Sequence, residues 1–143
     1  MQGTLEKHLN DFFRDITSFG GAGVYALILF ITLFLNTSLF IRLLIGFLVT
    51  LTAVFLTRIL YFKNRPKKES HNNFIEKIDA SSFPSLHSAR ITFLALTFSN
   101  YFINRFVTLF CILIATLVIY SRIHRKKHDW VDVIAGMTLG GLV

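Results

Sequence analysis

Residues that build disulfides, loops and a soluble surface are scarce in this chain. Its 143 residues include one cysteine, two prolines and 16% charged side chains, whereas soluble domains are about a quarter charged. The single cysteine, Cys111, excludes an intrachain disulfide and a cysteine-rich metal site. The low charged fraction argues against an ordinary soluble domain.

Apolar residues, by contrast, are abundant and occur in long runs. They make up 53% of the chain and include 16 phenylalanines. The runs cover about residues 22–35, 39–60, 86–102, 106–120 and 130–143, and a membrane-spanning helix needs about 20 residues. The pattern predicts an all-α, polytopic membrane bundle of about five transmembrane helices, the last one short, in one domain over residues 1–143.

The N-terminal segment and the last run carry two further patterns. Leucine, phenylalanine and isoleucine recur at roughly helical spacing over residues 3–17. This predicts an amphipathic helix lying at the membrane interface, with a frayed tail as the alternative. Gly136 and Gly140 are four residues apart, which favours close packing against a neighbouring helix; ordinary membrane-helix glycines are the alternative.

The polar segments between the runs alternate between the two sides of the membrane. With five runs, the N-terminus, residues 61–84 and residues 121–129 fall on one side, and the turns at 36–38 and 103–105 fall on the other. The two chemically rich segments, 61–84 and 121–129, therefore face the same water layer. A single site can be built from both.

One candidate for that site is an imidazole–carboxylate pair. His128 and Asp132 are four residues apart, and on a helix that spacing brings two side chains within mutual reach. A carboxylate there can hold the imidazole in one tautomer, which makes it a useful base or nucleophile. The alternative is a basic juxtamembrane loop followed by a helix-starting aspartate.

A second candidate is a phosphate site. Arginine side chains are permanently charged forks that match phosphate oxygens, and the free N–H groups of a helix start bind anions. A helix start is predicted just after Pro84, where Ser85 can add a hydroxyl donor and His87 a proton. The candidate phosphate-binding residues are Arg58, Arg65, Ser85, Leu86 and Arg122. Interfacial arginines and a simple helix cap are the alternatives.

Three ordered motifs in these segments resemble those of the type 2 phosphatidic acid phosphatase (PAP2) superfamily. The family's motifs are Lys, six residues, Arg-Pro; then Pro-Ser-Gly-His; then Ser-Arg, five residues, His, three residues, Asp. The matching residues here are Arg58 with Arg65-Pro66, then Pro84-Ser85-Leu86-His87, then Ser121-Arg122 with His128 and Asp132. Two positions depart from the family pattern: Arg58 replaces the lysine and Leu86 replaces the glycine.

The resemblance implies a metal-independent lipid phosphatase without a cofactor. His128 would attack phosphorus and form a phosphohistidine, His87 would protonate the leaving group, and Asp132 would orient His128. The substrates it allows are phosphate monoester or diphosphate lipids of the phosphatidic acid, phosphatidylglycerol phosphate, polyprenyl diphosphate or lipid A type. A lipid phosphotransferase with the same site and a non-catalytic binder of anionic lipids are the alternatives.

Arg90 and the positions of the other cations indicate which partners the protein binds. Arg90 follows His87 by three residues, so we expect it to contact the phosphate or a second headgroup charge, with a snorkelling arginine as the alternative. The cations lie at the ends of apolar runs, which favours a phosphorylated membrane lipid and the bilayer as partners over nucleic acid.

The side of the membrane that the site faces follows from two arguments that disagree. On the site's side we count thirteen cations and on the other only Arg42 and Arg105, so the positive-inside rule places the site in the cytoplasm. The thirteen are Lys7, Arg14, Arg58, Lys63, Arg65, Lys67, Lys68, Lys77, Arg90, Arg122, Arg125, Lys126 and Lys127. Bacterial members of the resembled family mostly face the periplasm or outside. We expect a multi-pass protein of the cell (inner) membrane with a periplasmic site, the cytoplasmic face being the alternative.

Overall fold

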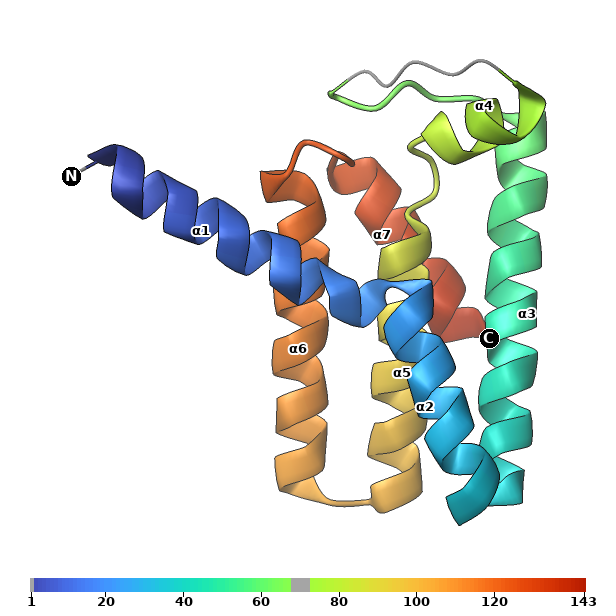
Figure 1. Ribbon diagram of the computed structural model, residues 1–143. Coiled ribbons are helices and arrows are strands. Elements are labelled where there is room, and N and C mark those ends of the chain that lie inside the picture. The colour runs from blue at the N-terminus through green and yellow to red at the C-terminus, as the bar shows by residue number, and fades with distance from the viewer. Residues whose placement is uncertain (1, 68–72) are drawn as a thin grey trace.

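The fold is entirely helical. The computed structural model describes residues 2–67 and 73–143, and no strand occurs in these ranges; Lys68 lies outside them. In chain order the elements are α1 (Gln2–Ile16), the 3₁₀ helix η1 (Thr17–Gly20), α2 (Ala22–Leu35), α3 (Thr37–Leu60), α4 (Phe74–Ala80), α5 (Leu86–Phe102), α6 (Arg105–His124) and α7 (Trp130–Leu142) (Figure 1). The predicted all-α class is confirmed, and each of the five apolar runs forms a helix.

Polar residues between the apolar runs begin the helices. Asn36 precedes α3, and its side-chain oxygen accepts a hydrogen bond from the Leu39 N–H at 2.8 Å. Asn104 caps α6 in the same way through the Phe106 N–H at 2.9 Å. Such caps satisfy N–H groups that have no partner within the helix. Short polar turns are therefore sufficient to separate one helix from the next.

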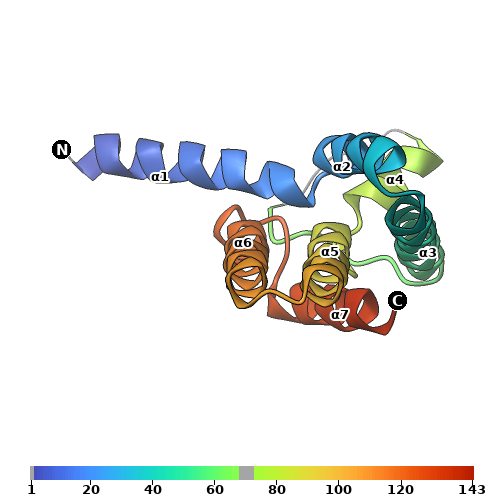
Figure 2. The ribbon, with the colours of Figure 1, turned by 90° about the horizontal axis from the view of Figure 1, so that it is seen from below.

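Helix α5 lies in the centre of the bundle. Figure 2 shows it surrounded by α2, α3, α6 and α7. Three of its side chains belong to the buried apolar core, which comprises Tyr25, Leu39, Leu43, Ile91, Phe93, Leu94, Ala115, Val118, Ile119 and Val133. Burial of such side chains is favourable by about 1.5–3 kcal/mol each in water, but within a bilayer close packing contributes more than burial.

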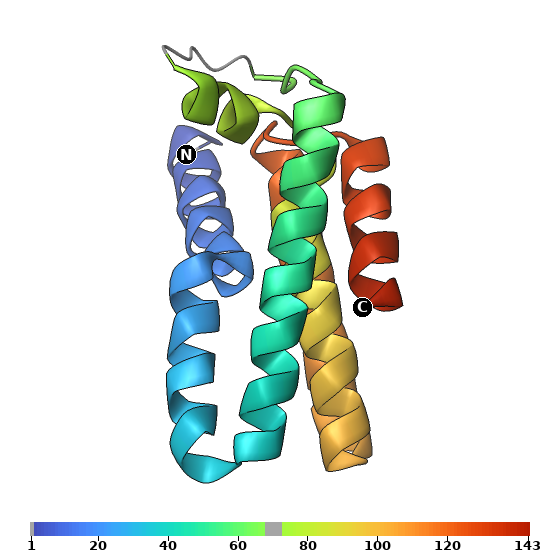
Figure 3. The ribbon, with the colours of Figure 1, turned by 90° about the vertical axis from the view of Figure 1, so that its right-hand side faces the viewer.

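Helix α7 packs directly on the backbone of α5. A Cβ atom added at Gly136 would lie 2.4 Å from the carbonyl oxygen of Ser85, and one added at Gly140 would lie 2.2 Å from that of Ala89. Both distances are far below van der Waals contact. The two glycines therefore form the helix contact that their spacing favours. α7 covers only the upper half of the bundle in Figure 3.

The outward faces of the helices are apolar, as a membrane protein requires. Helices α3 and α6 are each long and apolar enough to cross a bilayer. α1 together with η1 and α2 could form a third span bent by 45°, and α7 is an apolar helix too short to qualify.

Two α-helices lie outside the five apolar runs, one in residues 61–84 and one at the N-terminus. Residues 61–84 contain the seven-residue helix α4, which the sequence did not predict; Asn73 caps it. The predicted N-terminal helix is present as α1. Its Phe13 contacts Tyr120 and His124 of α6, while Leu5 and Phe12 remain exposed and available to lipid.

The α5–α7 contact yields a prediction for stability. Gly140→Ala places a methyl group against the Ala89 carbonyl, and overpacking of this kind destabilises by about 1–3 kcal/mol. Gly141→Ala is the matched control, because its methyl group would meet only a Leu96 side-chain atom at 3.9 Å. Thermal unfolding in detergent should show a lower midpoint for the first variant alone. Equal midpoints for the two variants would contradict the close packing.

Candidate active site

Four parts of the chain meet at the upper end of the bundle in Figure 1: the end of α3, the 81–85 segment that descends into the bundle, the start of α5, and the turn from α6 to α7. Hydrogen bonds join them. The Arg58 guanidinium donates to the Pro84 carbonyl at 3.2 Å, and the Ser85 N–H donates to the Asp132 carbonyl at 3.0 Å. Segments far apart in sequence thus lie together at the end of the bundle where the alternating topology predicts a site.

His128 is buried and held by the backbone. Its side chain is 2% exposed, and its Nδ1 atom lies 2.7 Å from the Ser82 carbonyl oxygen. Since a carbonyl oxygen can only accept, Nδ1 carries a proton, and in the neutral ring the lone pair is on Nε2. Nε2 lies 3.4 Å from a guanidinium nitrogen of Arg122. The lone pair is therefore directed toward Arg122.

Asp132 is farther from the imidazole than the four-residue spacing suggested. Its Oδ2 atom is 3.7 Å from His128 Nδ1, beyond hydrogen-bond range. The reason is that α7 begins at Trp130, so His128 precedes the helix and does not share its face. Asp132 instead closes a capping box with Asp129.

Lys63 is a partner that the sequence did not reveal. Its Nζ atom donates to Asp129 at 2.6 Å and to Asp132, which is fully buried, at 2.7 Å. Although partial burial alone lowers the pKa of Lys63, these two carboxylates raise it above its ordinary value. No spacing rule connects residues 66 and 69 positions apart. Lys63 neutralises a buried carboxylate beside the imidazole.

Arg58 of the first motif and Arg122 of the third are buried, and each has an N–H group without a partner among the described residues. Arg58 and Arg122 are 8% and 7% exposed, and the Nε atom of each has no hydrogen-bond partner. Arg65 donates to the Asp79 carbonyl in the loop beside them. An unsatisfied buried donor costs about 1–3 kcal/mol, more when it is charged. A bound anion would satisfy these groups.

The start of α5 completes the anion site. Ser85 is fully buried and caps the helix, its hydroxyl oxygen accepting from the Ser88 hydroxyl at 2.9 Å. Leu86 and His87 occupy the first turn, where backbone N–H groups are free for an anion. Leu86 does not have positive φ, so the conformational freedom of the family's glycine is not required here.

The N-terminal segment also touches the site, which sequence reasoning missed. The Arg122 guanidinium donates to the Thr17 hydroxyl of η1 at 3.1 Å. A Cβ atom added at Gly20 would lie 3.1 Å from the Cβ of His87. η1 thus packs against one histidine and one arginine of the site. Nothing in the spacing of the motifs connects it to them.

Comparison with known proteins gives one family and one fold. The family model described as the PAP2 superfamily matches residues 42–143. Among solved structures, the crystal structure of Aquifex aeolicus LpxE is similar, with a TM-score of 0.80 and 20% sequence identity over 94% of this chain and 81% of that chain. A search of curated proteins gives no match. The structural likeness, at this identity, concerns the fold alone.

The contacts of His128 generate a prediction about its protonation. Burial lowers the pKa of His128 below its ordinary value, with Arg122 acting in the same direction and Asp132 opposing. The neutral ring therefore persists below pH 6.5 and is lost only as the pH falls through the lowered value. Lys63→Met leaves the Asp132 carboxylate unpaired beside the ring, which favours the imidazolium and raises that pKa.

NMR titration of the His128 ring in detergent-solubilised protein measures this shift. Lys77→Met is the control, because Lys77 is exposed and lies over the Phe62 ring rather than beside Asp132. The titration midpoint should rise in the Lys63 variant and stay unchanged in the control. An unchanged midpoint in both would show that Lys63 does not govern the charge around His128.

Proposed function

The chain belongs to the PAP2 superfamily, and we propose that it is a membrane lipid phosphatase that hydrolyses a phosphate monoester or diphosphate lipid through a phosphohistidine. The observation that carries the proposal is the His128 ring. Its Nδ1–H is fixed by the Ser82 carbonyl, and its Nε2 faces the Arg122 guanidinium. The lone pair of a potential nucleophile thereby points toward a buried guanidinium group that could bind the phosphate of a substrate.

The first chemical step transfers the phosphoryl group to the protein. The Nε2 lone pair of His128 attacks phosphorus, and the bond from phosphorus to the leaving oxygen breaks. His87, in its protonated form, gives its proton to that oxygen. Arg58, Arg122 and the first-turn N–H groups of α5 stabilise the charge on the equatorial oxygens, since they are fixed before the reaction begins.

The second step returns the protein to its starting state. His87, now neutral, takes a proton from a water molecule whose oxygen attacks phosphorus. The phosphorus–nitrogen bond breaks, inorganic phosphate leaves, and His128 recovers its Nε2 lone pair. Each proton given in the first step is recovered in the second, and no metal or cofactor enters the balance.

The surroundings of the site fit a substrate held in a bilayer. The outward faces of α3 and α6 are apolar, and the site lies at the end of the bundle where the polar loops gather. We place the protein in the cell membrane, with the site facing the periplasm. Asp132 and Lys63 act as positioning residues, because neither provides an atom that reacts.

Phosphate release from purified protein tests the proposal. Wild-type protein offered a panel of lipid phosphates in detergent should release inorganic phosphate in the presence of EDTA, and His128→Ala should lower the rate by at least about 1,000-fold. Release that collapses on adding EDTA would exclude the metal-independent mechanism. Absence of release from wild-type protein with every lipid would overturn the assignment as a phosphatase.

A further inference from the structure

One buried charge in the bundle is not used by the chemistry described so far. Arg90 of α5 is 5% exposed, and its Nε atom has no hydrogen-bond partner in the part of the chain that the structure describes. Among the described residues no carboxylate forms an ion pair with it. Its guanidinium carbon lies 4.7 Å from the centre of the Phe47 ring of α3. That ring supports the cation but provides no anion.

A guanidinium in this position needs a partner. Buried charges in proteins are paired, because removal from water costs several kcal/mol. A cation–π contact offsets only about 2 kcal/mol of this. Inside a membrane bundle a residue of this kind marks a functional site by default. The missing partner is an anion that is not part of the described chain.

The position of Arg90 along α5 indicates which anion this is. Arg90 follows His87 by three residues, which places it about 4.5 Å further along the helix axis. That direction leads away from the polar loops and into the bundle. Residues three apart on a helix lie on about the same face, so Arg90 and His87 are neighbours along one side of α5. Arg90 therefore lies beside the site, on the side of the proton donor.

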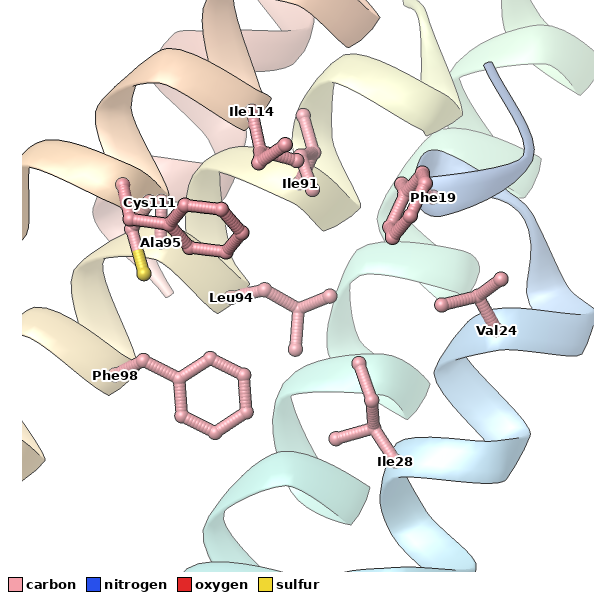
Figure 4. A pocket seen from close by; sticks show the side chains of 10 residues that line it. Phe19, Val24, Ile28, Ile91, Leu94, Ala95, Phe98, Cys111 and Ile114 are labelled. Atoms are coloured by element: carbon pink, nitrogen blue, oxygen red, sulfur yellow. The ribbon is translucent and has the colours of Figure 1, made fainter. Parts of the chain in front are cut away.

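An apolar cavity follows Arg90 along the same helix. It has a volume of about 250 Å³, and α5 contributes Ile91, Leu94 and Phe98 to its wall (Figure 4). Val24 and Ile28 of α2 lie opposite them. Along the chain from the start of α5, a proton donor, an unpaired cation and the residues of an apolar wall thus follow one another, and Arg90 itself does not line the cavity.

We propose that Arg90 binds the second phosphate of a lipid diphosphate, the phosphate that remains on the lipid after cleavage. This assignment rests on the proposed function. In a monoester the leaving oxygen is attached directly to carbon, so no anionic group is bonded to it. In a diphosphate the leaving oxygen belongs to a second phosphate, and the hydrocarbon chain follows it. The order of groups on α5 matches the second case.

The atoms of the cleavage step balance for such a substrate. His128 attacks the terminal phosphorus, and the bond from that phosphorus to the bridging oxygen breaks. His87 protonates the bridging oxygen, which stays with the lipid as a phosphate monoester. The bidentate fork of Arg90 stabilises the charge of this product as it forms.

Binding of two inorganic anions tests the assignment without turnover. Calorimetry on detergent-solubilised His128→Ala protein should show tighter binding of inorganic diphosphate than of inorganic phosphate. In the same His128→Ala background, Arg90→Met introduces an apolar side chain of similar length and should reduce that preference by about 10- to 100-fold. Arg90→Lys should retain part of it, because a lysine is a charge without the fork. Arg42→Gln removes an exposed cation from the other end of α3 and should change nothing.

Turnover gives the second readout. In proteins with an intact His128, Arg90→Met should lower kcat/KM for a prenyl diphosphate by about 10- to 100-fold and leave that for the prenyl monophosphate of equal chain length within about threefold. A structural role for Arg90 would lower both alike, and that result would overturn the assignment. An unchanged preference for diphosphate in Arg90→Met would also overturn the assignment. If Arg90→Met does not fold, an Arg90→Lys variant with the full wild-type preference would overturn it. If the protein prefers diphosphate in binding but releases no phosphate, the proposed phosphatase activity is wrong. The proposed role of Arg90 in binding diphosphate is then still supported.

Discussion

The rest of the structure depends on guanidinium groups that are buried at one end of an apolar bundle and form no ion pair with a carboxylate in residues 2–67 and 73–143. Arg58, Arg90 and Arg122 are each less than a tenth exposed, and each has an unsatisfied Nε. Such groups destabilise the free protein. A bound anion would satisfy these groups. The same arginines that lower the stability of the ligand-free protein would therefore raise its affinity for the anion.

The helices around these arginines provide the rigidity that such a site requires. α7 packs on α5 through Gly136 and Gly140, which fixes the turn that carries His128 against the start of α5. Lys63 neutralises Asp132, and the Ser82 carbonyl selects the tautomer of His128. The backbone thus orients the ring of His128, the proposed nucleophile. Asp132, which the spacing suggested as its partner, instead holds the start of α7. Both effects keep the lone pair in place before any substrate binds.

Much of this could be predicted from the sequence, because membrane helices appear as apolar runs and their alternation assigns the polar loops to one side. The helix contact at Gly136 and Gly140 and the convergence of Arg58, His87, Arg122 and His128 follow from those patterns. The contribution of Thr17, the carbonyl of Ser82 and the ion pairs of Lys63 could not be predicted. Each depends on where two chain segments of irregular backbone meet, which periodicity does not encode.

The central claim is that His128 carries the phosphoryl group during the reaction. Wild-type protein mixed with a lipid substrate labelled in its terminal phosphate, and quenched in alkali within milliseconds, should yield a labelled peptide that contains His128 and bears the label on its imidazole. The label should be lost on acid treatment, as expected of a phosphorus–nitrogen bond. Label on another residue, or phosphate release without any labelled protein at the earliest times, would contradict the account.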